Sequence, residues 1–209
     1  MLAKVNSVAV VGLDAHAVEV EVDLAAGLPM FTVVGLPDLT VRESRDRVRS
    51  ALRNTGLTFP QRRVTVNLAP AHFRKEGAGF DLPIALGILA AEGLIPMAML
   101  QHFVVIGELS LEGLVKRVQG VLSMAMFFKD RPIKGFLVPR ENGAEAAIVG
   151  GVTIYPVATV PEVMEFLNQA QEREPSLRTD QLVQMVKEEF GVTVHARSIE
   201  RQFLRQKKR

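Results

Sequence analysis

The segment AHFRKEGAGFD, residues 71–81, runs directly into LPIALGILAAEG, residues 82–93. The first part is polar and contains closely spaced glycines, as loops do, whereas the second part is apolar on every side of a helix. Asp81 stands where an N-cap residue is expected, and Pro83 falls within the first helical turn, where its missing N–H is harmless. We therefore predict a loop that leads into a helix buried at the centre of the domain.

Strand-like and helix-like segments alternate through the first 165 residues. Strands are predicted over residues 8–11, 16–23, 30–34, 62–69, 135–139 and 152–157, and a hairpin is predicted to pair residues 103–108 with residues 113–118. Helices are predicted over residues 40–54, 118–129, 142–149 and 160–169. The first of these helices opens with the capping-box spacing of Thr40 and Glu43, and Thr159 is expected to cap the last.

Two of these elements indicate which side faces the core. In residues 16–23 (HAVEVEVD) valines alternate with polar or small side chains, so one face of the strand is apolar and the other is wet. In the helix of residues 40–54, the apolar stripe consists of Val41, Val48 and Leu52. The remaining surface of that helix carries Arg42, Arg45, Arg49 and Arg53.

The composition changes near residue 171, where we place the boundary between a domain of residues 1–170 and a tail of residues 171–209. The whole chain has a net charge of only +2, but the last fifteen residues hold six Lys or Arg and a single Glu. After a polar linker, helices are predicted over residues 179–190 and 196–208, in a helix-turn-helix arrangement. The alternative is a helical hairpin that packs on the main domain.

Cysteine is absent from the 209 residues. Its absence excludes a disulfide framework, a thiolate zinc site and a cysteine nucleophile. No apolar run reaches the roughly 18 to 20 residues that span a bilayer. The early acidic residues do not fit a signal peptide, so we expect a cytoplasmic protein with no membrane partner.

Neither a nucleotide site nor a metal site is indicated. A Walker loop needs the pattern GxxxxGK[ST], in which backbone amides and a lysine hold the phosphates. Here Lys75 precedes the glycines instead of following them, and no Gly-Lys-Ser/Thr occurs. The histidines at positions 16, 72, 102 and 195 form no HxH or HExxH pattern. We therefore expect no ATP hydrolysis by these residues, and no cofactor or metal.

Four blocks of sequence resemble, in the same order, the N-terminal domain of the magnesium-chelatase-like ComM/YifB family of competence ATPases. The blocks are residues 3–15 (ending in SVAVVGLDA), 27–52 (GLPMFTVVGLPDLTVRESRDRVRSAL), 63–91 (RVTVNLAPAHFRKEGAGFDLPIALGILAA) and 104–125 (VVIGELSLEGLVKRVQGVLSMA). The resemblance covers about residues 1–168.

That N-terminal domain is similar to the Lon-type protease fold, so the resemblance implies an α+β domain with a mixed β-sheet and helices, followed here by a short α-helical tail. Lon-like proteases use a serine nucleophile and a lysine base. The resemblance places Gly79 at the serine position and Leu122 at the lysine position. Neither side chain can perform that chemistry, which implies that the fold is kept and the protease activity is lost. A residual serine peptidase that uses Ser123 and Lys116 is the alternative.

On this alignment, the loop before the buried helix is a former active-site loop. The residues expected to shape it are Lys75, Glu76, Gly77, Gly79 and Asp81. A positive φ is expected at Gly77 or Gly79, where alanine would be strained. We also expect Arg74 and Lys75 to lie opposite Glu108 and Glu112 and to form ion pairs or a polar rim with them.

The family resemblance implies a role in DNA processing, because ComM-type proteins act as ring-forming helicases on branched DNA during natural transformation. Their motor is a AAA+ module after about residue 170, and its Walker motifs are not found here. We therefore expect a non-catalytic DNA-processing accessory domain, with a AAA+ ATPase or a second copy of the chain as partner. A decayed or truncated gene product is another alternative.

The tail is similar to short helix-turn-helix segments of transposase- and integrase-like proteins. Its second predicted helix places four basic side chains on one face, where they are expected to bind DNA phosphates. These residues are Arg197, Arg201, Arg205 and Lys208.

Overall fold

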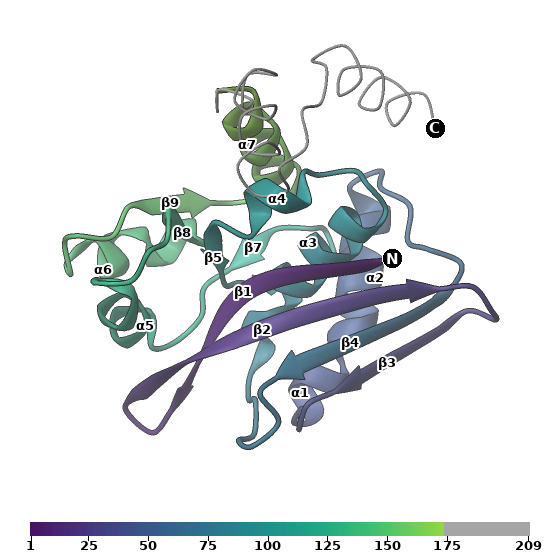
Figure 1. The fold of residues 1–209 in the computed structure, drawn as a ribbon, viewed down its shortest axis with the longest axis horizontal. Coiled ribbons are helices and arrows are strands. Elements are labelled where there is room, and N and C mark those ends of the chain that lie inside the picture. The colour runs from purple at the N-terminus through teal and green to yellow at the C-terminus, as the bar shows by residue number, and fades with distance from the viewer. Residues whose placement is uncertain (174–209) are drawn as a thin grey trace, which may run out of the picture. The chain divides into compact units, whose positions relative to one another are not determined.

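The computed structural model describes residues 1–173, of which residues 1–169 form one compact unit (Figure 1). A seven-stranded sheet has the strand order β3-β4-β2-β1-β5-β8-β9. Its strands are β1 (Leu2–Val11), β2 (Asp14–Ala25), β3 (Met30–Val34), β4 (Arg63–Ala69), β5 (Phe103–Val105), β8 (Gly135–Pro139) and β9 (Ile154–Val157). A separate small sheet pairs β6 (Glu108–Leu109) with β7 (Val115–Lys116).

The helices of the described chain are mostly short. They are α1 (Leu39–Arg42), α2 (Ser44–Asn54), α3 (Asp81–Ala91), α4 (Met97–Leu100), α5 (Val121–Phe128), α6 (Gly143–Ala147) and α7 (Val160–Arg173). Two 3-10 turns, Ala78–Phe80 and Arg140–Asn142, precede α3 and α6. None of the helices within residues 1–173 has the length and apolar character needed to cross a bilayer.

The sheet is mixed, and the predicted α+β class is confirmed. β2 runs antiparallel to both β1 and β4, whereas the pairs β3–β4, β1–β5, β5–β8 and β8–β9 are parallel. The alternation in β2 is also confirmed, because Val18, Val20 and Val22 are buried while the intervening side chains are half-buried or exposed. The predicted boundary at residue 170 and the two tail helices stay predictions, since the tail lies outside the described residues.

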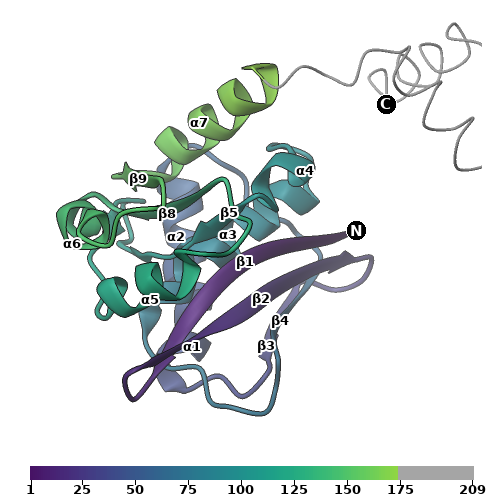
Figure 2. The same cartoon turned by 60° about the vertical axis from the view of Figure 1, so that its left-hand side comes forward.

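The apolar composition of residues 82–91 predicts a central buried helix, and α3 is such a helix. Every residue from Asp81 to Ala91 is buried. Figures 1 and 2 show α2 and α3 on one face of the β1–β4 part of the sheet, and α3 contacts β1, β2 and α2. The stripe of α2 is confirmed too, because Val41 just before it, Val48 and Leu52 are fully buried.

A close approach of α3 to the sheet depends on Gly87. A Cβ built at this position would lie 2.5 Å from Cγ2 of Val22 and 3.5 Å from Cγ2 of Val5. Both valines are buried strand residues, and β-branched side chains have little rotamer freedom. The helix can therefore rest on β1 and β2 at this distance only because residue 87 has no side chain.

The predicted hairpin of residues 103–108 with residues 113–118 is wrong in its first half. Residues 103–105 form β5 inside the main sheet, and only the short β6 and β7 pair as a hairpin. The chain leaves the sheet at Gly107, whose N–H donates to the Gly79 carbonyl at 2.9 Å and whose carbonyl accepts from Leu82 N–H at 2.9 Å. These long-range bonds to the loop separate β5 from β6, although residues 103–108 look like one continuous strand in the sequence.

The predicted capping box of Thr40 and Glu43 is also wrong. Asp38 is the N-cap residue, because its Oδ1 accepts from the Val41 N–H at 2.7 Å, and Thr40 lies inside α1. The chain then turns at Glu43 before α2 begins. By contrast, the cap at Thr159 is confirmed by a 3.2 Å bond from the Glu162 N–H to its Oγ1, although α7 extends to Arg173.

Replacing Gly87 by alanine tests the packing of α3. In an open helix this change stabilises by roughly 0.5–1 kcal/mol, but here the added methyl group meets Val22, so we expect a net loss of about 1–3 kcal/mol in unfolding free energy. Urea denaturation measures the loss. In a Val22→Ala background the same substitution should cost much less, because the space is free. A stabilising effect of Gly87→Ala in the otherwise unchanged protein would contradict this packing.

Candidate functional site

The loop between β4 and α3 is held against the segment that precedes α1. The Lys75 N–H donates to the Leu36 carbonyl at 3.1 Å, and the Asp38 N–H donates to the Lys75 carbonyl at 3.0 Å. Pro37 and Lys75 thus form an isolated parallel bridge. Two segments about 40 residues apart in the chain are fixed to each other through backbone bonds.

The side chain of Lys75 is fully buried and points back into its own loop. Its Nζ donates to the Phe73 carbonyl at 2.9 Å and to the Pro70 carbonyl, and it lies 4.2 Å from the centre of the Phe73 ring. Burial lowers the pKa of the Lys75 amine. The expected rim of Arg74 and Lys75 facing Glu108 and Glu112 is therefore wrong for Lys75, which binds carbonyl oxygens instead.

The two glycines of the loop, Gly77 and Gly79, differ in backbone conformation. Gly77 has a φ of 82°, so the predicted positive φ is confirmed there, whereas Gly79 is not among the residues with a positive φ. The Gly77 N–H donates to Oδ2 of Asp38 at 3.2 Å, so that carboxylate caps α1 with one oxygen and holds the loop with the other. Glu76 is exposed and lies 3.8 Å from Arg74, which is a weak surface pair.

Gly79 is half-buried, and the atoms nearest to the place of its missing side chain are apolar. A Cβ at this position would lie 3.2 Å from Cγ1 of Ile106 and 3.7 Å from Cγ1 of Val118. The first distance is tighter than ordinary van der Waals contact, so even a methyl group would require a small shift. Gly79 has no side chain that could serve as the nucleophile at the position to which the resemblance assigns it.

Asp81 forms a buried ion pair with Arg47 of α2. The Arg47 Nε donates to Oδ2 at 2.6 Å and Nη2 donates to Oδ1 at 3.0 Å, a two-pronged arrangement in which the Asp81 carboxylate is fully buried. Oδ2 also accepts from the Leu109 N–H at 3.2 Å, and Arg47 Nη2 donates to the Thr40 carbonyl at 2.8 Å. The pair joins α1, α2, α3 and β6.

The prediction that Asp81 caps α3 is wrong. Asp81 has helical angles and lies in the first turn, and Phe80 occupies the N-cap position without a side-chain bond. Its carboxylate binds Arg47 because that guanidinium, on the neighbouring helix, satisfies both oxygens at once. Burial raises the pKa of the Asp81 carboxyl, while the bonds from Arg47 oppose that rise. The same pair raises the pKa of the Arg47 guanidinium.

Asp38 and Arg47 are the residues of this cluster that sequence reasoning did not select. For each of them, the sequence contains a spacing that could have identified it. Asp38 stands three residues before Val41, a good N-cap spacing. Arg47 lies next to Val48 on α2 and four residues before Ala51, both buried, so its side chain leaves the helix beside the apolar stripe and not on the exposed face.

The other residues of interest lie elsewhere. Leu122 is in the first turn of α5, its side chain is partly exposed, and its N–H donates to Oε1 of Glu145 at 3.3 Å. Ser123 is half-buried and Lys116 is exposed on β7. The tail residues proposed to bind DNA are outside the described residues; they are Arg197, Arg201, Arg205 and Lys208.

The surface beside the loop is a polar pocket without metal-site geometry. Its volume is about 370 Å³, and Asp38, Arg42 and Arg74 line it together with Leu36, Pro37 and Leu39. Within residues 1–173, no cluster of three or more His, Asp or Glu side chains is placed to hold a metal ion. The loop cluster is therefore a network of hydrogen bonds around one buried ion pair, with cationic side chains at its edge.

A family model described as subunit ChlI of Mg-chelatase matches residues 20–142. The chain belongs to the ChlI family. The matched region runs from β2 to the turn before α6 and contains Arg47, the loop and Asp81, so this ion pair lies within the part that defines ChlI membership.

Curated relatives of this ChlI-family chain agree with the resemblance to the ComM/YifB proteins, which is confirmed. Competence protein ComM of Haemophilus influenzae is 44% identical over 174 residues, which cover 83% of this chain and 34% of that protein. The uncharacterized protein YifB of Salmonella typhimurium is 38% identical over 179 residues, covering 86% and 35%. Lon protease 2 of Bacillus subtilis is 27% identical over 193 residues, covering 82% and 34%. The chain spans about a third of the length of these relatives.

Replacing Arg47 by methionine tests the ion pair of this ChlI-family domain. The change leaves the Asp81 carboxylate buried without its cation, so we expect a loss of about 3 kcal/mol of unfolding free energy at pH 7, at the lower end for a broken buried pair because Arg47 is partly exposed. Urea denaturation measures it. Arg45→Met on the same helix, at an exposed position, should change stability by less than about 0.5 kcal/mol.

The pH dependence of the Arg47→Met deficit has a definite sign. Without Arg47, the pKa of folded Asp81 rises further above its unfolded value of about 3.9. A raised carboxyl pKa gives stability that is present at low pH and is lost as the pH rises through the folded-state value. The deficit should therefore be largest near neutral pH and shrink toward pH 4. A deficit that grows on acidification would contradict the assignment.

Proposed function

We propose that this domain is a non-catalytic accessory domain that acts in DNA processing together with an ATPase motor. The observation that carries the non-catalytic part is the glycine at position 79, which has no nucleophilic atom where the Lon-like resemblance places the nucleophile. Nucleophilic catalysis needs an oxygen, sulfur or nitrogen nucleophile with a base in hydrogen-bond reach and space for the substrate. Gly79 offers no such atom, and the side chains nearest to the place of its missing Cβ are those of Ile106 and Val118.

The polar groups near Gly79 support the same proposal, because each is committed to holding the fold. The Lys75 amine binds two carbonyls of its own loop, and the Asp81 carboxylate binds Arg47 and the Leu109 N–H. A general base or acid must be free to exchange a proton with substrate. These two groups are enclosed and already paired, so they fit a structural role.

The DNA-processing part of the proposal rests on family membership. ComM, a relative at 44% identity, is described as a competence protein. The 209 residues hold no Walker loop, so the proposal places ATP hydrolysis in a AAA+ module outside these residues. Contacts to that module, to a second copy of the chain and to DNA through the basic tail are parts of the proposal.

The alternative is a residual serine peptidase of Lon-like fold. It would need Ser123, in α5, to be activated by Lys116, on β7. In the described part of the chain no hydrogen bond joins these two side chains. The Leu122 backbone between them is bonded to Glu145.

A fluorophosphonate probe separates the two functions. We expect no covalent adduct on the intact protein by mass spectrometry, because the described residues present no activated serine. Ser123→Ala is the matched control. An adduct that forms on the natural sequence and disappears in Ser123→Ala would establish the peptidase alternative and overturn the non-catalytic proposal.

The DNA-binding role of the tail is tested in the full chain by changing the four basic residues of the predicted binding face to glutamine, namely Arg197, Arg201, Arg205 and Lys208. Because each phosphate contact contributes about 0.9 to the slope of log affinity against log salt for duplex DNA, we expect weaker binding and a clearly flatter slope. Fluorescence anisotropy with labelled duplex DNA measures both.

The matched control for the tail changes four exposed basic residues of the main domain to glutamine, namely Lys116, Arg117, Lys129 and Arg131. It removes the same charge, so it should lower affinity only slightly. Equal affinity and equal slope for the tail variant and the natural sequence would overturn the tail as a DNA-binding element.

A further inference from the structure

The exposed face of α2 carries three arginines spaced by four residues, Arg45, Arg49 and Arg53. With a rise of 1.5 Å per residue, their stems follow each other at about 6 Å along the helix. Arg49 and Arg53 line a pocket of about 480 Å³, and Arg45 and Arg49 line an adjoining cavity of about 40 Å³. Arg49, Phe59 and Gln61 belong to both, so we call the joined space the arginine groove.

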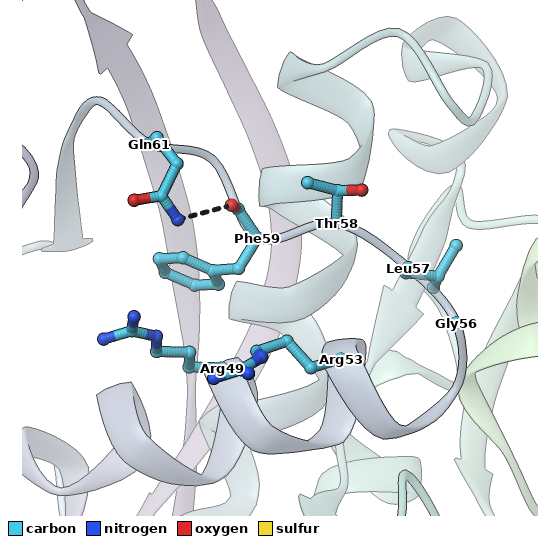
Figure 3. A pocket seen from close by; sticks show the side chains of 7 residues that line it. All are labelled: Arg49, Arg53, Gly56, Leu57, Thr58, Phe59 and Gln61. Atoms are coloured by element: carbon cyan, nitrogen blue, oxygen red, sulfur yellow. Dashed lines mark hydrogen bonds between the residues drawn. The ribbon is translucent and has the colours of Figure 1, made fainter.

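The opposite wall of the arginine groove is the segment that follows α2. Figure 3 shows Arg49 and Arg53 rising from the helix, with Phe59 and Gln61 facing them from the connection to β4. The Arg49 guanidinium lies 6.0 Å from the centre of the Phe59 ring, and that ring packs on Phe31 of β3 at 6.2 Å. The groove thus has an apolar floor between its cationic wall and a polar rim.

Nε of Arg45, at one end of the groove, lies 4.0 Å from Oδ1 of Asp46, but Arg49 and Arg53 have no acidic partner within residues 1–173. At the far end, Arg62 lies 3.8 Å from Glu92. The Nε of Arg49 is shielded from solvent and has no hydrogen-bond partner in the described chain. Like charges four residues apart on a helix repel each other, and a buried N–H without an acceptor is costly. An anionic ligand in the groove would relieve the repulsion between these guanidinium groups.

We infer that the arginine groove binds consecutive phosphates along one strand of a nucleic acid. A row of cations about 12 Å long, from Arg45 to Arg53, fits a linear polyanion better than an isolated phosphate. Positively charged grooves with an aromatic element are the usual arrangement for single strands. The proposal that the polyanion is a nucleic acid rests on the proposed function in DNA processing. The proposal that the groove binds a polyanion does not rest on it.

Binding of a labelled single strand of 20 nucleotides to the full chain tests this site. In Arg49→Gln/Arg53→Gln, we expect the dissociation constant to rise about tenfold or more at low salt. The slope of log affinity against log salt should fall by about 1.4, because each single-strand contact contributes about 0.7. Arg117→Gln/Arg131→Gln removes the same charge from another exposed surface and should change the affinity less than twofold.

A charge-preserving variant guards against a merely structural effect. Arg49→Lys/Arg53→Lys keeps both cations and should retain most of the salt slope, while losing part of the affinity. If Arg49→Gln/Arg53→Gln binds like the natural sequence while the tail variant does not, the groove is overturned and the proposed function stands. If the natural sequence shows no salt-dependent binding to single or double strands, both are overturned.

Inorganic pyrophosphate distinguishes a strand from a free phosphate group. A site for consecutive phosphates should release the labelled strand only at pyrophosphate concentrations that act through general ionic strength. Displacement at submillimolar pyrophosphate, lost in Arg49→Gln/Arg53→Gln, would show a small-anion site and overturn the inference of a strand.

Discussion

The buried ion pair between Arg47 and Asp81 connects helices α1, α2 and α3 and strand β6 through side-chain bonds. One guanidinium reaches the first turn of α3 and the carbonyl of Thr40, while the carboxylate also holds the β6 backbone at Leu109. Removal of either partner leaves a buried polar group unsatisfied, so the positions of α2, α3 and the loop before α3 depend on each other.

The same region shows how a protease-like architecture can exist without a protease site. At the position assigned to the nucleophile, the Gly79 carbonyl accepts a hydrogen bond from the Gly107 N–H, and the side chains nearest to Gly79 are apolar. Lys75 and Asp81 are the kinds of side chain that a catalytic site uses, yet here both complete local networks. Ionisable groups near a former site are thus weak evidence for activity unless their partners are known.

Local periodicity was enough to predict much of the fold. The alternating valines of β2, the apolar helix after Asp81 and the stripe through Val48 of α2 all follow from spacing and hydrophobicity. The role of Asp81 could not be obtained in this way, because Arg47 lies 34 residues earlier and a local cap was the simpler reading. The false hairpin has the same cause. The backbone at Gly107 leaves the sheet to bind Gly79, and the residues next to Gly107 contain no pattern that predicts this long-range contact. The bonding partners of the loop residues needed three-dimensional information.

The enclosure of Lys75 has a kinetic consequence. An amine reacts with acylating reagents only as the solvated free base, and this one is fully buried and donates to two carbonyls of its own loop. Its reaction must therefore wait for the loop to open, whereas the exposed lysines, such as Lys116 and Lys129, react from the native state. The rate of modification at this single position consequently reports the frequency of local opening between β4 and α3, and it does so with a probe that the natural sequence already carries.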